Sequence, residues 1–226
     1  MPDPNSSSAR GPAIGAGVAR LLAGTPWVPA GGTVLLCLGT VAVFLVQYFI
    51  GVGRSVRGLG LIPASIWHPA SYASVWDGQW VPPPVALATY MLLHGNWFHL
   101  IANMGALWLF GAMAERPMGT RRFVLTYLAY GLLTGLVIAA VVPRSTAAIA
   151  GASGAMAGIL GTYLGEGARP IRGGRRRMLR CAEAAAILAL AAWFALRTVP
   201  TEPNRLCSIV YHFVPFLVAW MVGRRW

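Results

Sequence analysis

The sequence has few charged residues and no lysine. Only 11% of its 226 residues are charged, 57% are hydrophobic, and the mean hydropathy is +0.62. Soluble domains carry charge on about a quarter of their residues, so this composition excludes a soluble domain and predicts an integral membrane protein. The net charge of +12 comes from arginine alone. Such a balance can indicate nucleic acid or anionic lipid, but the positions of the arginines favour a role in membrane topology, with no nucleic-acid partner.

Cysteines are also scarce. The three that occur, Cys37, Cys181 and Cys207, lie in or at the ends of apolar segments. They show neither paired spacing nor the spacing of metal ligands. The sequence therefore offers no disulfide framework, and we interpret all three as packing residues.

Long apolar runs recur at about the length that crosses a bilayer, ~20 residues. They predict an all-α polytopic membrane protein with six spans, near residues 31–52, 85–114, 122–142, 151–167, 179–197 and 207–223. Residues 1–30 are rich in Gly, Ala, Ser and Pro, which predicts a disordered tail and not a cleaved signal peptide. The membrane domain would then occupy residues 31–226.

The segment 53–84, between the first two spans, is the longest predicted loop on the outside. It carries Trp67, Trp76 and Trp80 among prolines and glycines. Aromatic residues of this kind favour the headgroup region of a bilayer. We therefore expect an interfacial loop that lies partly in the outer surface of the membrane.

The arginines give the orientation of the spans. If the N-terminus is cytoplasmic, most of the arginines fall in inside segments, including the run RPIRGGRRRMLR at residues 169–180. This asymmetry is the one described by the positive-inside rule. A lysine-free chain rich in Arg, Ala, Gly and Pro is typical of a bacterium with a high-GC genome, so we expect a bacterial plasma membrane.

Polar side chains inside a membrane span are costly and are therefore functional candidates. The stretch HGNWFHLIANMGALWLFG places His94, His99 and Asn103 in the outer half of the second span. His99 and Asn103 are four residues apart, so they share a helix face, and each can donate a hydrogen bond. His94 lies off that face, and we interpret it as a structural residue at the helix end.

A serine opens the fourth span. Ser153 stands in GASG with Gly151 and Gly154 close by, so no bulky neighbour blocks its hydroxyl, and the first N–H groups of a helix have no partner within it. A serine needs a base to act as a nucleophile. His212, the only histidine downstream, lies in the sixth span at a comparable depth. Ser153 and His212 are therefore a candidate nucleophile and base.

These residues, in this order on a six-span frame, resemble the rhomboid family of intramembrane serine proteases. The resemblance also rests on GAMAERPMGTRRFVLTYL at residues 111–128 and covers about residues 35–223. It implies the six-helix rhomboid fold and a dyad in which Ser153 attacks a peptide carbonyl while His212 transfers the proton.

The same resemblance implies the remaining parts of the site. The Ser153 N–H, His99 and Asn103 would hold the oxyanion of the tetrahedral intermediate, with His94, Gly151 and Gly154 in supporting roles. Substrates would be single-span membrane proteins within the lipid bilayer, and no metal or organic cofactor is implied.

Some positions depart from the family pattern. Ala157 stands where an aromatic residue usually supports the histidine, and Pro215 and Ala219 replace glycines that usually follow it. A Trp-Arg pair that commonly precedes the second span is also absent. Proline inside a helix removes a hydrogen bond and favours a kink. These departures keep a second hypothesis open, a catalytically inactive rhomboid-like protein that binds transmembrane clients.

Two further classes fit the sequence less well. A small transporter would place polar groups near the middle of the membrane, usually with inverted repeats, whereas here they lie towards one face. A zinc site built from His94, His99 and His212 lacks an H-E-x-x-H helix and a nearby carboxylate. The sequence carries no signal for the identity of the substrates or for the oligomeric state.

Overall fold

The computed structural model describes residues 29–68, 78–167 and 202–223. Over these ranges the chain is helical, with one isolated bridge between Leu61 and Ile149. The expected all-helical class with apolar membrane helices is confirmed for this part of the chain, while the number of six spans stays a prediction. The tail expected at the N-terminus and the fifth span expected at 179–197 lie outside the described residues.

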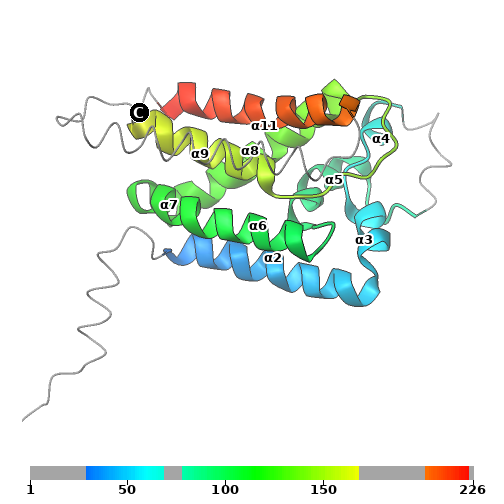
Figure 1. The fold of residues 1–226 in the computed structure, drawn as a ribbon, viewed down its shortest axis with the longest axis horizontal. Helices are drawn as coiled ribbons and strands as arrows, with labels where there is room; N and C mark the ends of the chain where they lie inside the picture. The colour runs from blue at the N-terminus through cyan, green and yellow to red at the C-terminus, as the bar shows by residue number, and fades with distance from the viewer. Residues whose placement is uncertain (1–28, 69–77, 168–201, 224–226) are drawn as a thin grey trace, which may run out of the picture.

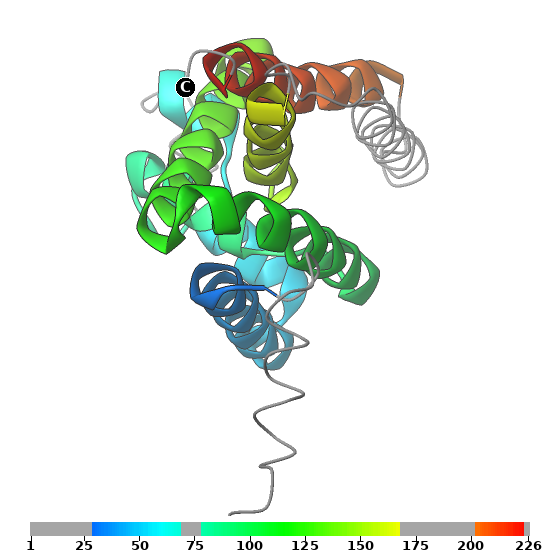
Figure 2. The ribbon, with the colours of Figure 1, turned by 90° about the vertical axis from the view of Figure 1, so that its left-hand side faces the viewer.

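The helical elements follow in chain order, and Figure 1 labels the α-helices among them. They are α2 (Gly31–Ile50), α3 (Val52–Leu59), α4 (Pro63–Trp67), α5 (Pro83–Thr89), the 3₁₀ turn η2 (Tyr90–Leu92), α6 (Trp97–Ala106), the π-helical turn η3 (Leu107–Gly111), α7 (Ala112–Met118), α8 (Thr120–Val141), α9 (Ser153–Gly167) and α11 (Glu202–Gly223). α9 lies beside α11, and α8 packs against both (Figures 1 and 2).

Three of the described helical stretches are long and apolar enough to cross a membrane, by length and composition. They are Gly31–Ile50, Trp97–Met118 and Thr120–Val141. The first and third match two predicted spans within a few residues. α9 lies within the predicted fourth span, and α11 covers the predicted sixth span but begins earlier, at Glu202.

The predicted second span at 85–114 is interrupted. η2 ends at Leu92, the next four residues are not helical, and a new helix begins at Trp97. The expectation of one continuous helix is therefore wrong at this point. The reason is local, because the Asn96 side chain accepts the N–H of His99 at 2.7 Å. This is an N-cap, which starts a new helix within the apolar run.

Large apolar side chains cover the outside of the molecule. Leu35 is 65% exposed, Phe49 86% and Ile101 64%. The interior contains bulky residues such as Phe123 and Tyr127, both fully buried, together with a set of buried polar side chains. An apolar exterior suits a lipid solvent, where backbone groups must be paired within the chain.

The described part of the loop between α2 and α5 packs against α8 and against the segment before α9. Leu61 donates its N–H to the Ile149 carbonyl at 3.0 Å and accepts the Ile149 N–H at 2.8 Å. The indole N–H of Trp67 donates to the Ala139 carbonyl at 2.7 Å. The two Leu61 bonds anchor the loop to the chain just before GASG, and the Trp67 bond anchors it to α8. Its predicted position at the membrane surface stays a prediction.

A buried carboxylate ties α7 to the start of α2. Glu115 is 1% exposed, and its two oxygens accept the N–H groups of Gly32 at 2.6 Å and Thr33 at 2.8 Å. The Thr120 hydroxyl donates to the same carboxylate at 2.7 Å. The first N–H groups of a helix lack partners and carry partial positive charge. α2 has no side-chain cap of its own, so Glu115 caps it from another helix.

We expect Glu115→Gln to lower the free energy of unfolding by about 2 kcal/mol, because hydrogen bonds to a charged group are worth roughly 1.5–3 kcal/mol and an amide cannot accept at both positions. Thr120→Val removes one donor only and should cost about 1 kcal/mol. Thermal unfolding in detergent, followed by circular dichroism, measures both. A Glu115→Gln variant as stable as the wild type would contradict the capping role.

Candidate active site

Ser153 stands at the first position of α9, directly after a bend at Ala152. Gly151 has a φ of +136°, a conformation that favours glycine, and its N–H donates to the Tyr90 carbonyl at 3.0 Å. The neighbouring Ala152 is fully buried, whereas Ser153 is partly exposed. The loop therefore presents the serine hydroxyl at the helix start, where the N–H of a first residue has no partner within the helix.

The structure brings Ser153 together with His212. The Nε2 atom of His212 lies 2.7 Å from the Oγ atom of Ser153, although the two residues are 59 positions apart in the sequence. This is a short hydrogen bond between a hydroxyl and a ring nitrogen. The pair has the contact that a base needs to remove a proton from a nucleophile.

The close approach of α9 and α11 depends on glycine. A Cβ atom added at Gly161 would collide with the Phe216 carbonyl and would lie 2.9 Å from the Cβ of Ala219. At Gly165 it would meet the Trp220 carbonyl at 2.5 Å. The two helices therefore pack backbone against backbone along this stretch, which small residues permit.

Two further glycines of α9, Gly154 and Gly158, face α8 instead of α11. A Cβ at Gly154 would overlap the Thr134 side chain, and one at Gly158 would overlap the ring of Tyr130. α9 is thus held closely on both sides. Its position, and with it the position of Ser153, is fixed by contacts that admit no larger side chain.

The departures from the family pattern on α11 are accommodated. Pro215 is buried within α11, which runs on to Gly223. Ala219 is 0% exposed and packs its methyl group against Gly161. The proline and the alanine therefore coexist with the 2.7 Å contact between His212 and Ser153.

His99 and Asn103 of α6 lie against the loop before Ser153. A Cβ atom added at Gly151 would lie 2.9 Å from Nε2 of His99 and 3.9 Å from Nδ2 of Asn103. The absence of a side chain at Gly151 is what lets the ring approach the loop. Both predicted donors thus come from one helix face and point at the same segment of chain.

His94 is in direct contact with Asn103. Its ring is fully buried, and its Nε2 lies 2.8 Å from Nδ2 of Asn103. Because an amide nitrogen can only donate, this bond assigns one Asn103 hydrogen to His94 and leaves the second for another acceptor. The His94 ring also meets His99 edge-on, with 4.9 Å between ring centroids. The structure therefore joins His94, expected to support the helix end, to both predicted donors.

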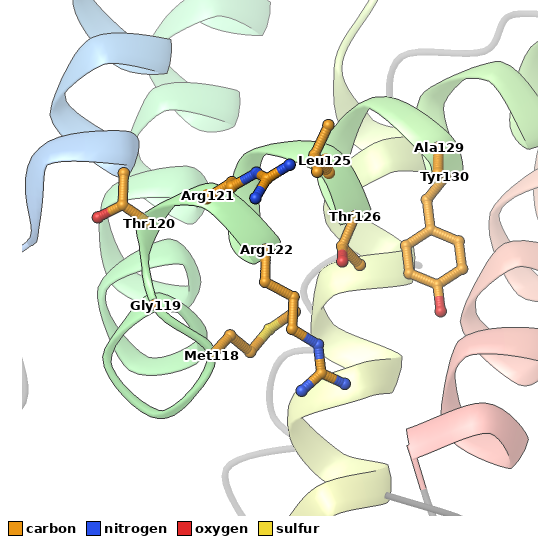
Figure 3. A pocket seen from close by; sticks show the side chains of 9 residues that line it. All are labelled: Met118, Gly119, Thr120, Arg121, Arg122, Leu125, Thr126, Ala129 and Tyr130. Carbon is orange, nitrogen blue, oxygen red and sulfur yellow. The ribbon is translucent and has the colours of Figure 1, made fainter.

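A separate hollow of about 770 Å³ lies at the turn between α7 and α8 (Figure 3). Arg121, Arg122 and Tyr130 are among the residues that line it. The lining contains neither Ser153 nor His212. This hollow is therefore not part of the candidate site.

The fold is a helical membrane bundle that holds a serine and a histidine in contact between two helices. A family model described as Rhomboid domain matches residues 78–224, which is more than half of the chain. The protein therefore belongs to the rhomboid family.

Individual relatives are similar over shorter stretches. The Rhomboid protease GluP of Bacillus subtilis (strain 168) is 45% identical over 88 residues, which are 39% of this chain and 16% of that protein. Rhomboid-like protein 11, chloroplastic, of Arabidopsis thaliana is 31% identical over 136 residues, 59% of this chain and 41% of that protein. The chain spans less than half the length of the curated relatives it matches.

The sequence does not predict the partners of two buried polar residues, one that contacts His94 and one at the opposite end of α2. Gln47 of α2 contacts the backbone of His94, and Glu115 caps α2. The signal in the sequence is a glutamine and a glutamate inside apolar segments. Polar side chains are costly within a membrane span, so each indicates a structural or functional contact. Their partners could not be assigned, because they lie tens of residues away.

We expect Gly161→Ala to lower the free energy of unfolding by about 1–3 kcal/mol, the usual cost of overpacking. The matched control is Gly39→Ala in α2, where no described atom lies within 4 Å of the added methyl group. That change should be neutral or stabilising by up to ~1 kcal/mol, because alanine is the better helix former. Thermal unfolding of both variants in the same detergent makes the comparison. Equal effects of the two substitutions would contradict the close packing of α9 and α11.

Proposed function

We propose that this protein is an intramembrane serine endopeptidase that cleaves transmembrane-helix substrates with a Ser153–His212 dyad. The observation that carries the proposal is the 2.7 Å contact between His212 Nε2 and Ser153 Oγ. Membership of the rhomboid family supports it, as does the similarity to a relative named as a rhomboid protease.

The reaction begins at the serine hydroxyl. His212 Nε2 takes the proton from Ser153 Oγ as the oxygen attacks the carbonyl carbon of the scissile peptide bond. The C–N bond then breaks, and His212 gives the proton to the leaving amine, which leaves an acyl group on Ser153. A water molecule, deprotonated by the same histidine, attacks that ester, and the proton returns to Ser153 as the acid product departs.

The negative charge on the carbonyl oxygen is stabilised by three donors. The backbone N–H of Ser153 is free of helical bonding by its position at the start of α9, and the side chains of His99 and Asn103 lie against the same loop. Donors of this kind act where charge develops, and the loss of one costs about 10²- to 10³-fold in kcat. This charge explains why a membrane helix retains two polar side chains.

The glycines around the nucleophile have supporting roles. Gly151 leaves room for His99 beside the loop, and Gly154 leaves room for Thr134 of α8. A side chain at Gly151 would displace His99, and one at Gly154 would push α9 away from Thr134. The absence of a Cβ atom at Gly151 and Gly154 therefore allows the close packing around the site.

The substrates that fit such a site are single-span membrane proteins. A peptide bond within a helix is unavailable until the helix unwinds, and small residues near the cleavage point make unwinding easier. We place the protein in a bacterial plasma membrane with its N-terminus in the cytoplasm, so that the site opens towards the outer face. The orientation follows from the distribution of arginine.

The test is cleavage of a single-span model substrate by the purified protein in liposomes. Ser153→Ala and His212→Ala should each lower the rate by more than about 10⁴-fold, as removal of a nucleophile or base does in other serine proteases. Ser55→Ala, which changes a serine whose hydroxyl donates to the Gly51 carbonyl at the N-cap of α3, should leave the rate unchanged. Equal cleavage by wild type and Ser153→Ala would end the proposal. A wild type that binds the substrate without cleaving it would identify an inactive rhomboid-like protein.

A further inference from the structure

Gln47 is a buried polar residue at the far end of α2. Its exposed fraction is 2%, and it ends the buried stripe of α2, which also contains Cys37, Thr40 and Phe44. A side-chain amide in such a position costs free energy unless both of its polar atoms are paired. Here both atoms are paired with the same residue.

The amide of Gln47 forms two hydrogen bonds with the backbone of His94. Its Oε1 accepts the His94 N–H at 3.1 Å, and its Nε2 donates to the His94 carbonyl at 3.4 Å. The two bonds hold the peptide groups of His94 at two points. An edge-on contact between the rings of Phe44 and Trp97, at 4.8 Å between centroids, holds the same two chain segments together one turn away.

His94 needs such a partner because it lies outside any helix. It belongs to the four-residue connection between η2 and α6, where helical bonding cannot satisfy its N–H and carbonyl groups. His94 is also withdrawn from the surface, with an exposed fraction of 0%. Gln47 supplies both missing partners from a different helix.

The position of His94 then fixes the amide of Asn103. The bond of 2.8 Å between His94 Nε2 and Asn103 Nδ2 sets the rotation of that amide and turns its nitrogen, not its oxygen, towards the loop at Gly151. If the His94 backbone were released, the ring could shift and the amide could turn. A donor displaced by about 1 Å can cost up to ~10²-fold in rate.

We propose that Gln47 is a positioning residue for catalysis, which acts through His94 to aim the Asn103 amide at the oxyanion. This inference rests on the proposed protease function. It gives α2, whose other described contacts are with neighbouring helices, a specific part in the reaction. Gln47 touches no reacting atom, so its effect should appear in kcat and not in the binding of substrate.

The first variant is Gln47→Met, which keeps the length of the side chain and removes both hydrogen bonds. We expect kcat to fall about tenfold with KM unchanged, because the Asn103 donor is displaced but not deleted. Gln47→Asn is shorter by one methylene and cannot reach both groups of His94, so it should lose kcat in the same way. It provides a second measurement if the methionine variant does not fold.

Two variants separate positioning from packing. Gln47→Glu keeps an oxygen where Oε1 accepts the shorter bond and should retain more of kcat than Gln47→Met. Thr40→Val is a matched control on the same buried face of α2. Thr40 is as buried as Gln47, and its hydroxyl has no hydrogen-bond partner among the described residues. It should leave kcat unchanged.

A double-mutant cycle tests the route through Asn103. In an Asn103→Leu background, Gln47→Met should change kcat by less than about twofold, because residues that act through one group are not additive. Thermal unfolding midpoints measured in parallel report any loss of stability separately from kcat.

The outcomes are distinguishable. If the wild type cleaves and Gln47→Met has wild-type kcat, the inference fails and the proposed function stands. The same holds if the tenfold loss persists in the Asn103→Leu background, since Gln47 would then act by another route. If the wild type cleaves no substrate, the proposed function fails and the inference fails with it.

Discussion

The close approach of α9 to its neighbours is the constraint on which the rest of the structure depends. Lipid gives helices no hydrophobic reason to associate, so contact must come from backbone packing and internal hydrogen bonds. Gly161 and Gly165 admit the backbone of α11, and Gly154 and Gly158 admit side chains of α8. Because the backbones of α9 and α11 meet, Ser153 on α9 and His212 on α11 can share a hydrogen bond of 2.7 Å.

A second consequence of the lipid setting is that buried polar groups find partners from distant parts of the chain. At one end of α2 the Glu115 carboxylate takes up the free N–H groups of the helix. At the other end Gln47 holds the peptide groups of His94, whose ring bonds to Asn103. α2 is therefore fixed at both ends by polar contacts, and one of these contacts leads to the candidate site.

Much of this could be predicted from the sequence, because apolar runs mark the helices and a serine, two histidines and an asparagine in membrane spans stand out by their cost. The sequence does not predict the break before Trp97, because its signals, Gly95 and Asn96, interrupt a run that stays apolar on both sides. The partners of Gln47 and Glu115 could not be predicted, since they lie 47 and 83 residues away. Periodicity within a window carries no information about contacts at that range.

In the proposed mechanism, Ser153 is a nucleophile activated by His212. The most direct measurement is labelling of the detergent-solubilised protein with a fluorophosphonate, followed by mass spectrometry of the labelled peptide. We expect one adduct on Ser153 in the wild type and no adduct in His212→Ala, because attack by the serine requires the base. An unlabelled wild type, or labelling of Ser153 that continues at the same rate without His212, would contradict it.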